Sequence, residues 1–328
     1  MIRRPPRSTL DRSSAASDVY KRQDSDPPPS PVNRQLPFSI TDEQKQRFST
    51  DGVVCLRGLF DDDWIGLLTA GIEKNLSDPG QRSRIWDRTA DNRTMFYDSD
   101  NWRRIPEYEQ FVYHSPCVDI ATALLTTDRV NFFFDAVFVR STGVTFPTPW
   151  HQDEPYWSAG GMDTVSIWMP LVPVSRESAL AFVPGSHLWP NHFRQRDFGE
   201  LNPDRQQDVN TVSFSGDWEP FPDIESDRNR YGVTSWEIQL GDCIAFNGRI
   251  IHGGSGALAP DRALKVFNTQ WLGDDVRVNF RPYGMDPDHS EKMRAAGMGH
   301  GDRLDGGVYP RLPQDGNSAA FEVDAGPG

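Results

Sequence analysis

The first third of the chain has apolar residues at helical spacing, separated by short polar breaks. A capping side chain at Ser39 or Thr41 precedes two acids, which predicts a helix that runs through Phe48 and ends at Asp51-Gly52. Three further acids precede a second apolar stretch with the same spacing. The elements expected after the first helix are a short strand at 53–56, a helix at 64–72 and a helix at 119–125.

From about Val130 the pattern changes to short runs of β-branched and aromatic residues, separated by proline and glycine. Such a pattern is typical of an all-β barrel or sandwich. The polar segment 190–231 is long for a loop, so we expect an insertion that lies over one end of the barrel. The expected strands are 132–140, 150–156, 164–171, 179–183, 234–239, 242–246 and 264–271.

The chain contains no internal repeat and no change of composition that would divide this pattern into two domains. The sequence therefore predicts one mainly β domain with an α-helical flank, at 38–328. Its expected parts are the helical flank at 38–129, the β core at 130–273 and an irregular C-terminal tail at 274–328.

The first residues are set apart from this domain. Residues 18–23 look like a translated transposon-end adaptor of the kind used to build DNA libraries, and residues 1–23 lack the apolar core of a signal peptide. We interpret residues 1–23 as a sequencing-adaptor artefact. The proline-rich tract 24–37 is expected to be a disordered lead-in.

The bulk composition excludes several classes of protein. The 328 residues are 37% hydrophobic, which is enough for a real core, while the longest apolar runs fall far short of the roughly 20 residues that a membrane span needs. A formal net charge of −13 argues against nucleic acid and anionic membranes as partners and leaves a small molecule. The three cysteines are odd in number and widely spaced, which fits neither a disulfide framework nor a structural zinc site and favours a reducing cytoplasm.

A histidine and a carboxylate lie two residues apart at His151 and Asp153, within the strand expected at 150–156. The period of two in a strand puts both side chains on one face, as two adjacent metal ligands. Non-haem iron(II) oxygenases use two imidazoles and one carboxylate on one face of an octahedron and leave three positions for a bidentate cosubstrate and dioxygen. This spacing alone is weak evidence, because such triplets occur by chance in many chains.

His252 is the expected third ligand, and His187 is the alternative. Arg262 lies ten residues beyond His252, at the head of another predicted strand. Its planar guanidinium suits bidentate pairing with the far carboxylate of a dicarboxylate cosubstrate, although a surface ion pair with Asp261 is also possible. His187 has no arginine at this distance and follows the tight turn at Pro184-Gly185, which favours a structural role.

Through these residues and several further motifs, the chain resembles the phytanoyl-CoA dioxygenase family of iron(II)- and 2-oxoglutarate-dependent oxygenases. The resemblance covers most of 41–271 and implies a double-stranded β-helix, a jelly-roll and cupin-like barrel with iron near one end. It also implies that Trp168 lines the cosubstrate pocket. The matching features are Asp51-Gly52-Val53-Val54, Thr148 to Asp153, Phe182 to His187, Gly241-Asp242 and the spacing from His252 to Arg262.

Two positions leave details of the site open. Gly254 stands where some members of the family have a serine that helps to hold 2-oxoglutarate. Arg140 precedes the loop 141–149, where relatives often carry a basic residue. It either meets an anionic substrate or cosubstrate, or it is a solvated arginine on the surface.

The resemblance implies a dioxygenase that uses Fe(II), 2-oxoglutarate and O2. The expected reaction is hydroxylation of a small organic metabolite with release of succinate and CO2, because Asp153 argues against halogenation; desaturation or cyclisation would need no change of ligands. Two other classes stay open. A cupin-like metal-dependent isomerase or hydrolase would not need Arg262, and a non-catalytic ligand-binding relative would typically have lost a metal ligand.

Overall fold

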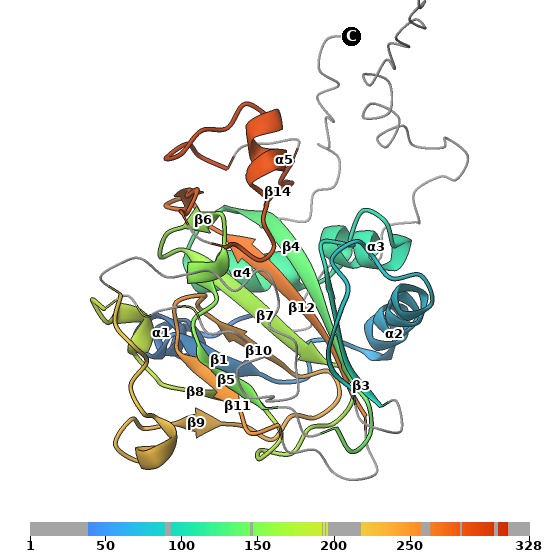
Figure 1. Ribbon diagram of the computed structural model, residues 1–328, viewed down its shortest axis with the longest axis vertical. Helices are drawn as coiled ribbons and strands as arrows, with labels where there is room; N and C mark the ends of the chain where they lie inside the picture. Colours follow the sequence, from blue (N-terminus) through green and yellow to red (C-terminus); the bar gives the residue numbers. More distant parts are fainter. Residues whose placement is uncertain are drawn as a thin grey trace, which may run out of the picture. The chain divides into compact units, whose positions relative to one another are not determined.

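Two antiparallel sheets of unequal size pack face to face around an apolar interior in the computed structural model (Figure 1). All described residues belong to the unit Asn33–Gly328, and the second unit, Met1–Val32, lies outside them. The structure describes residues 39–88, 93–144, 147–191, 193, 195, 218–256, 263–282, 284–304 and 308–313.

The larger sheet joins strands that are far apart in the sequence. Its order is β1-β10-β7-β12-β4-β3-β2, and β14 also pairs with β4. In that order the strands are β1 (Val53–Leu56), β10 (Cys243–Phe246), β7 (Thr164–Pro170), β12 (Leu264–Leu272), β4 (Arg129–Arg140), β3 (Thr94–Ser99), β2 (Arg84–Arg88) and β14 (Arg311–Pro313). The long strands predicted from β-branched and aromatic runs thus form the centre of this sheet.

The smaller sheet covers the inner face of the larger one and has the order β5-β11-β8-β9. A separate pair joins β6 (Ala159–Gly160) to β13 (Arg277–Val278). The strands of the smaller sheet are β5 (Thr148–His151), β11 (His252–Gly254), β8 (Ala181–Phe182) and β9 (Thr234–Ser235). The prediction of a mainly β jelly-roll barrel is confirmed, although β8 and β9 are shorter than predicted.

Side-chain alternation along β7 separates two apolar cores. Val165 and Ile167 join the cluster between the larger sheet and the helices. Trp168 joins Phe182 and other residues from both sheets in the interior of the barrel. Successive side chains of a strand point to opposite faces. Every second residue of β7 therefore faces the smaller sheet.

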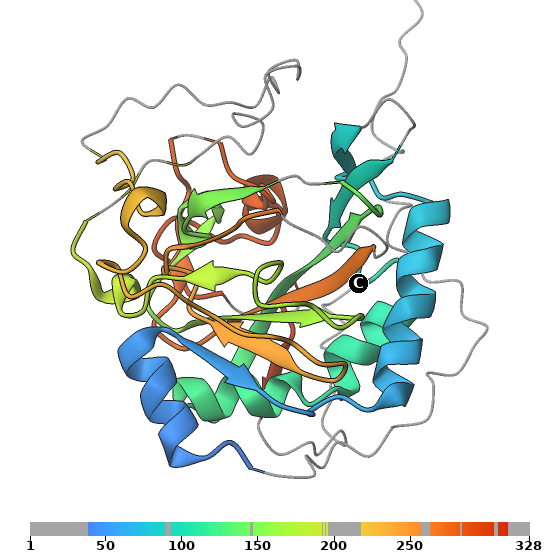
Figure 2. The same ribbon diagram turned by 90° about the horizontal axis from the view of Figure 1, so that it is seen from below.

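Four helices cover the outer face of the larger sheet (Figure 2). The first begins at the predicted cap, where the side chain of Thr41 accepts a hydrogen bond from the amide of Gln44, and Gly52 ends it in the left-handed conformation. No helix in the described part of the chain is long and apolar enough to cross a membrane. The four helices are α1 (Asp42–Asp51), α2 (Asp62–Ser77), α3 (Pro106–His114) and α4 (Cys117–Leu125).

Two regions differ from the prediction. The flank expected to be helical also contains β2 and β3, which extend the larger sheet beyond β4. The tail expected to be irregular contains α5 (Ser290–Ala295) and β14, and it buries Met293 and Leu312 in the apolar clusters. These elements were missed because so few residues cannot establish a period of two or of 3.6.

The described residues of the predicted insertion pack beside the smaller sheet. Phe193 and Ile224 form an apolar cluster with Val183, which follows β8, and Ile251, which precedes β11.

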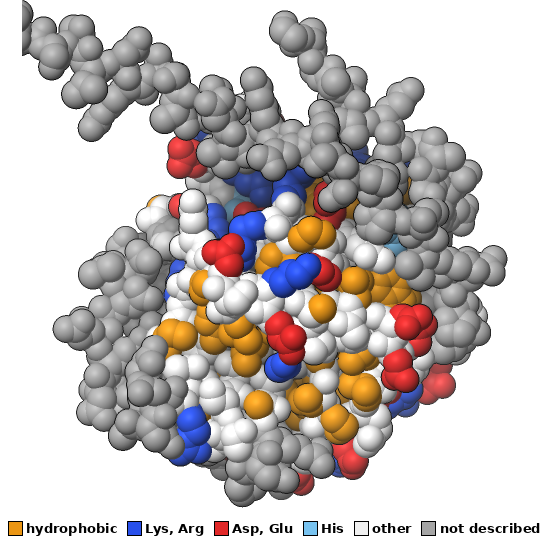
Figure 3. Space-filling model, turned by 90° about the vertical axis from the view of Figure 1, so that its right-hand side faces the viewer, with side chains coloured by type: hydrophobic (Ala, Val, Ile, Leu, Met, Phe, Trp, Pro, Cys, Tyr) orange, Lys and Arg blue, Asp and Glu red, His pale blue; other side chains and the backbone are white. Residues whose placement is uncertain are grey.

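On the side of the molecule seen in Figure 3, acidic and basic side chains are interspersed with apolar ones. Among the described residues seen on this face, basic side chains therefore form no continuous stripe for a phosphate backbone.

Gly52 occupies a position that other residues would strain. Its φ is 77°, and an added Cβ would lie 2.5 Å from Nδ1 of His187. We expect Gly52→Ala to lower the free energy of unfolding by about 2–4 kcal/mol, because the left-handed backbone and the overlap with a buried ring both cost energy. Denaturant unfolding measures this loss.

Gly58→Ala is the matched control for that prediction. Gly58 also has a left-handed backbone, with φ 59°, but nothing lies within 4 Å of its added Cβ. It should therefore lose only about 1 kcal/mol, the backbone part alone. Equal losses in the two variants would contradict the role given to the contact between Gly52 and His187.

Candidate metal centre

Two histidines face each other across neighbouring strands of the smaller sheet. His151 is the last residue of β5 and His252 the first of β11, and the two are paired directly in register. Residues paired in this way project to the same face of a sheet. Both are buried, with 4% and 3% exposed. Phe182 and Phe246 pack against the ring of His252, with ring centroids 5.7 and 4.8 Å away, which places it in the barrel interior.

Asp153 reaches these histidines from a turn. β5 ends at His151, and Asp153 has helical angles, with φ −78° and ψ −44°. The strand predicted at 150–156 is therefore wrong beyond His151. The amides of Asp153 and Glu154 both donate to the carbonyl of Gly248 at 2.8 Å, so the chain bends around the turn that leads to β11. The side chains of His151 and Asp153 do lie close together, as predicted. A bend in the chain brings them together, whereas the prediction relied on the pleat of a strand.

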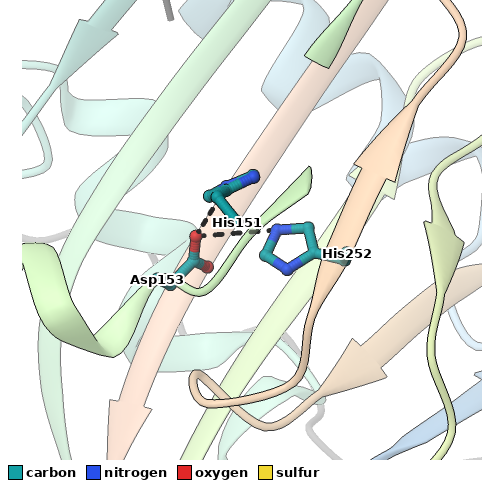
Figure 4. A group of neighbouring side chains, drawn as sticks. All are labelled: His151, Asp153 and His252. Carbon is teal, nitrogen blue, oxygen red and sulfur yellow. Dashed lines mark ion pairs between the residues drawn. The ribbon is translucent and has the colours of Figure 1, made fainter. Parts of the chain in front are cut away.

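The three side chains converge on one point (Figure 4). Oδ1 of Asp153 lies 3.2 Å from Nε2 of His151 and 3.6 Å from Nε2 of His252. One donor atom from each residue lies within 4.8 Å of the others. Adjacent donors about 2.1 Å from a shared octahedral ion are about 3 Å apart. Small side-chain shifts would therefore bring all three donors onto one ion.

Backbone carbonyls determine which ring nitrogen faces this point. Nδ1 of His151 lies 2.8 Å from the carbonyl of Pro149, and Nδ1 of His252 lies 3.1 Å from that of Ile250. A carbonyl oxygen only accepts hydrogen bonds, so each Nδ1 carries the proton and donates it. Nε2 of each ring therefore keeps its lone pair, and the hydrogen bond orients the ring as it does in metal sites.

The charge states also suit a cation. Burial and the neighbouring His151 lower the pKa of His252 to about 4, against the opposing effect of Asp153, so His252 is neutral at pH 7. Burial by itself would raise the pKa of Asp153, but the two imidazoles and the hydroxyl of Ser166 hold it below its usual value. A neutral imidazole and an ionised carboxylate both belong to the donor set that non-haem iron(II) uses.

Ser166 on β7 and Gln270 on β12 support the carboxylate. Oγ of Ser166 lies 3.4 Å from Oδ2 of Asp153 and also hydrogen-bonds Oε1 of Gln270. Groups that contact a ligand in this way orient it toward the metal. We did not predict Ser166, although it lies two residues before Trp168 and therefore on the same face of that strand.

A buried arginine from the C-terminal part holds the segment that follows Asp153. Arg281 pairs with the carboxylate of Glu154 at 2.6 Å and donates to the carbonyls of Glu154, Trp157 and Ala159 at 2.9, 2.8 and 3.3 Å. Only 7% of the Arg281 side chain is exposed. Because this segment starts at Asp153, the arginine restrains the ligand loop. No local motif connects it with His151, so sequence reasoning missed it.

Replacing Arg281 is expected to weaken metal binding. Arg281→Ala removes the hydrogen bonds of the guanidinium to this segment, and we expect its affinity for iron(II) to fall about tenfold or more, with Arg281→Lys between it and the wild type. Anaerobic competition with a chelator measures the affinity, at a temperature where circular dichroism shows every variant folded. Arg311→Ala is the control, because it removes a 2.6 Å ion pair to Asp274 in the same tail. Wild-type affinity in Arg281→Ala would contradict this role.

His187, the alternative ligand, lies outside the group of three. Its ring packs on Gly52, and its Nε2 lies 3.3 Å from the carbonyl of Ser49. Burial lowers its pKa. The geometry agrees with the structural role that was favoured for it.

Three other predicted site residues are Trp168, Arg140 and Arg262, of which the structure describes the first two. Trp168 lies in the interior cluster between the sheets, where a pocket residue is expected. Arg140 is buried, with 5% exposed, and its Nη1 donates to the carbonyl of Gly256 at 3.1 Å. A solvated surface position for Arg140 is thus excluded. Arg262 lies outside the described residues.

Comparisons with known proteins agree with this geometry. The sequence model of the phytanoyl-CoA dioxygenase family, PhyH, matches residues 48–262. A search of curated proteins found no match. Among solved structures, the non-heme alpha-ketoglutarate-dependent carbocyclase SnoK from nogalamycin biosynthesis has a TM-score of 0.62 and 19% identity, and the alignment covers 86% of this chain and 100% of SnoK.

Two further solved structures hold iron. The epimerase SnoN, in complex with Fe3+, alpha-ketoglutarate and nogalamycin RO, has a TM-score of 0.58 and 19% identity, with 82% of this chain and 97% of SnoN covered. EctD from S. alaskensis with bound Fe has a TM-score of 0.54 and 18% identity, with 75% and 81% covered. At these identities the likeness shows a shared fold.

Proposed function

Because the chain belongs to the phytanoyl-CoA dioxygenase family, whose members are iron- and 2-oxoglutarate-dependent oxygenases, we propose that it hydroxylates a small organic metabolite. In the proposed reaction one atom of O2 enters a C–H bond of the metabolite and the other enters succinate, while 2-oxoglutarate loses CO2. The observation that carries the proposal is the convergence of His151, Asp153 and His252 on one point inside the barrel.

The residues of the site have separate tasks. His151, Asp153 and His252 would hold iron(II), which when bound activates dioxygen at the expense of 2-oxoglutarate. Ser166 and Gln270 orient the carboxylate, and the carbonyls behind the two histidines keep Nε2 free for the metal. The protein thereby supplies a preset ligand geometry, so that little reorganisation is needed when the metal binds.

Arg262 and Trp168 are assigned to the cosubstrate. Arg262 would pair with the far carboxylate of 2-oxoglutarate through its planar guanidinium. Trp168 would form one wall of the pocket, and its 5% exposure fits a position from which water is excluded. Sequence spacing supports the assignment of Arg262, and the position on the inner face of β7 supports that of Trp168.

We place this reaction in the cytoplasm, on the strength of three cysteines that are all free thiols. The acidic chain, with a net charge of −13, makes nucleic acid an unsuitable partner and leaves small molecules as substrates. Residues 38–328 would act as one catalytic domain.

Incubation of the protein with a metabolite extract tests the proposed outcome. With iron(II), 2-oxoglutarate and isotopically heavy dioxygen, one metabolite should gain a single heavy oxygen atom, and succinate should carry the other. Omission of iron or of 2-oxoglutarate should prevent both changes. A product that gains oxygen without consumption of 2-oxoglutarate would contradict the proposal and favour a different metal-dependent enzyme.

The same experiment separates hydroxylation from other outcomes. The structural relatives SnoK and SnoN are named as a carbocyclase and an epimerase. A cyclisation removes two hydrogen atoms from the substrate and adds no oxygen, and an epimerisation leaves the mass unchanged, whereas hydroxylation adds one oxygen. An isomerase or hydrolase on a cupin-like barrel would leave 2-oxoglutarate intact.

A further inference from the structure

Asn268 on β12 has a buried amide whose oxygen finds no partner in the part of the chain that the structure describes. Only 5% of the residue is exposed, and among the described residues its Oδ1 has no hydrogen-bond partner. Its direct neighbours across the sheet are Trp168 on β7 and Ala136 on β4. A buried amide that is left unpaired lowers the stability of a fold, so its presence calls for a cause. A ligand that supplies the hydrogen bond is such a cause.

The side chain of Asn268 lies on the inner face of the larger sheet, the face that carries the support of the candidate metal centre. On β12, Val266 joins the interior cluster and Phe267 joins the cluster on the helix side. Asn268 therefore shares the inner face with Val266 and Gln270. Gln270 hydrogen-bonds Ser166, whose hydroxyl lies beside the carboxylate of Asp153. Asn268 thus lies two residues along the strand from Gln270, which supports the metal ligand Asp153 through Ser166.

The spacing suits a five-carbon dicarboxylate. Two residues of a strand rise by about 6.7 Å, which separates the levels of Gln270 and Asn268. A chain with four C–C bonds of about 1.5 Å extends about 5 Å between its end carbons. A 2-oxoglutarate molecule with its keto-acid end at the metal centre therefore reaches toward the level of Asn268. Trp168, which pairs with Asn268, belongs to the same buried apolar cluster as Phe182 of the smaller sheet. Such a packed interior favours a slender cosubstrate over a bulkier primary substrate.

We propose that the side-chain amide of Asn268 hydrogen-bonds 2-oxoglutarate, an inference that rests on the proposed function. The cosubstrate is a dianion that only accepts hydrogen bonds, so Nδ2 donates, and rotation of the amide by half a turn exchanges its oxygen and nitrogen. A hydrogen bond to a charged acceptor in a water-excluded interior is stronger than a neutral one. Asn268 then contributes to cosubstrate affinity from the wall opposite the smaller sheet.

Calorimetric titration of manganese(II)-loaded protein with 2-oxoglutarate tests this contact. Asn268→Leu keeps the approximate size of the side chain and removes its polar atoms, and Asn268→Ala is a second variant in case the first does not fold. Both should raise the Kd for 2-oxoglutarate about tenfold or more. The melting temperature of the metal-free Asn268→Leu protein should equal or exceed that of the wild type, because no internal hydrogen bond is lost.

Asn131→Leu is the matched control. Asn131 lies on β4 with the same 5% exposure, but its Nδ2 donates to the carbonyl of Tyr309 at 3.2 Å. This variant should melt at a lower temperature and bind 2-oxoglutarate as the wild type does. Wild-type Kd values in both Asn268 variants would overturn the inference, as would a change confined to the KM of the primary substrate. If the wild-type protein itself fails to bind 2-oxoglutarate, the proposed function fails, which is a different result.

Discussion

Replacing His252 with alanine is expected to weaken iron(II) binding severely and to abolish turnover of 2-oxoglutarate. His252 supplies one of three donor atoms, and its Nε2 lies 3.6 Å from Oδ1 of Asp153. Without it, one imidazole and one carboxylate remain, and we expect the affinity for iron(II) to fall by more than about a hundredfold. Anaerobic titration with iron(II) against a competing chelator measures the loss, and succinate formation measures turnover.

His187→Ala is the control for this prediction. His187 is buried to a similar extent, with 4% exposed, but its ring contacts Gly52. Its loss should lower the melting temperature and leave the affinity for iron(II) unchanged. The assignment of the third ligand would be wrong if His187→Ala lost iron and His252→Ala kept it.

Arg262→Ala is expected to raise the Kd for 2-oxoglutarate about a hundredfold while iron(II) still binds. The guanidinium would form two charge-assisted hydrogen bonds to one carboxylate, and each is worth more than a neutral hydrogen bond. Arg262→Lys should recover only part of the affinity, because an ammonium group cannot pair with both oxygens in the same plane. Calorimetry on the manganese(II)-loaded protein measures the Kd of each variant.

Arg176→Ala serves as the control for Arg262. Arg176 is exposed on the surface and has the same charge, so its removal tests for a general effect of charge on the binding of a dianion. We expect its Kd for 2-oxoglutarate to match that of the wild type. If Arg262→Ala also binds 2-oxoglutarate normally, Arg262 is not the anchor of the far carboxylate.

The central strands were predictable because their side chains follow a period that local sequence displays. β4, β7 and β12 are long runs of apolar and β-branched residues, and the first helix carries its own cap at Thr41. β14 and α5 have only three and six residues. They form because the rest of the fold provides partners for them: Leu312 of β14 and Met293 of α5 are both fully buried in apolar clusters. Tertiary contacts of this kind leave no local pattern.

The candidate site likewise contains residues that the sequence could predict and residues that it could not. His151 and Asp153 could be predicted from two positions in one motif, although the bend that joins them comes from the carbonyl of Gly248, about a hundred residues away in the chain. Arg281 and Asn268 could not be predicted. Arg281 acts through backbone carbonyls of a distant segment. Asn268 stands out only because its buried Oδ1 has no partner among the residues that the structure describes.

The most direct test of the account is the conversion of 2-oxoglutarate by the wild-type protein. Anaerobic protein with iron(II) and 2-oxoglutarate should develop a weak visible absorption band, and admission of dioxygen should then produce succinate and CO2 in equal amounts. Iron-loaded, folded protein that shows neither the band nor succinate would contradict the central claim.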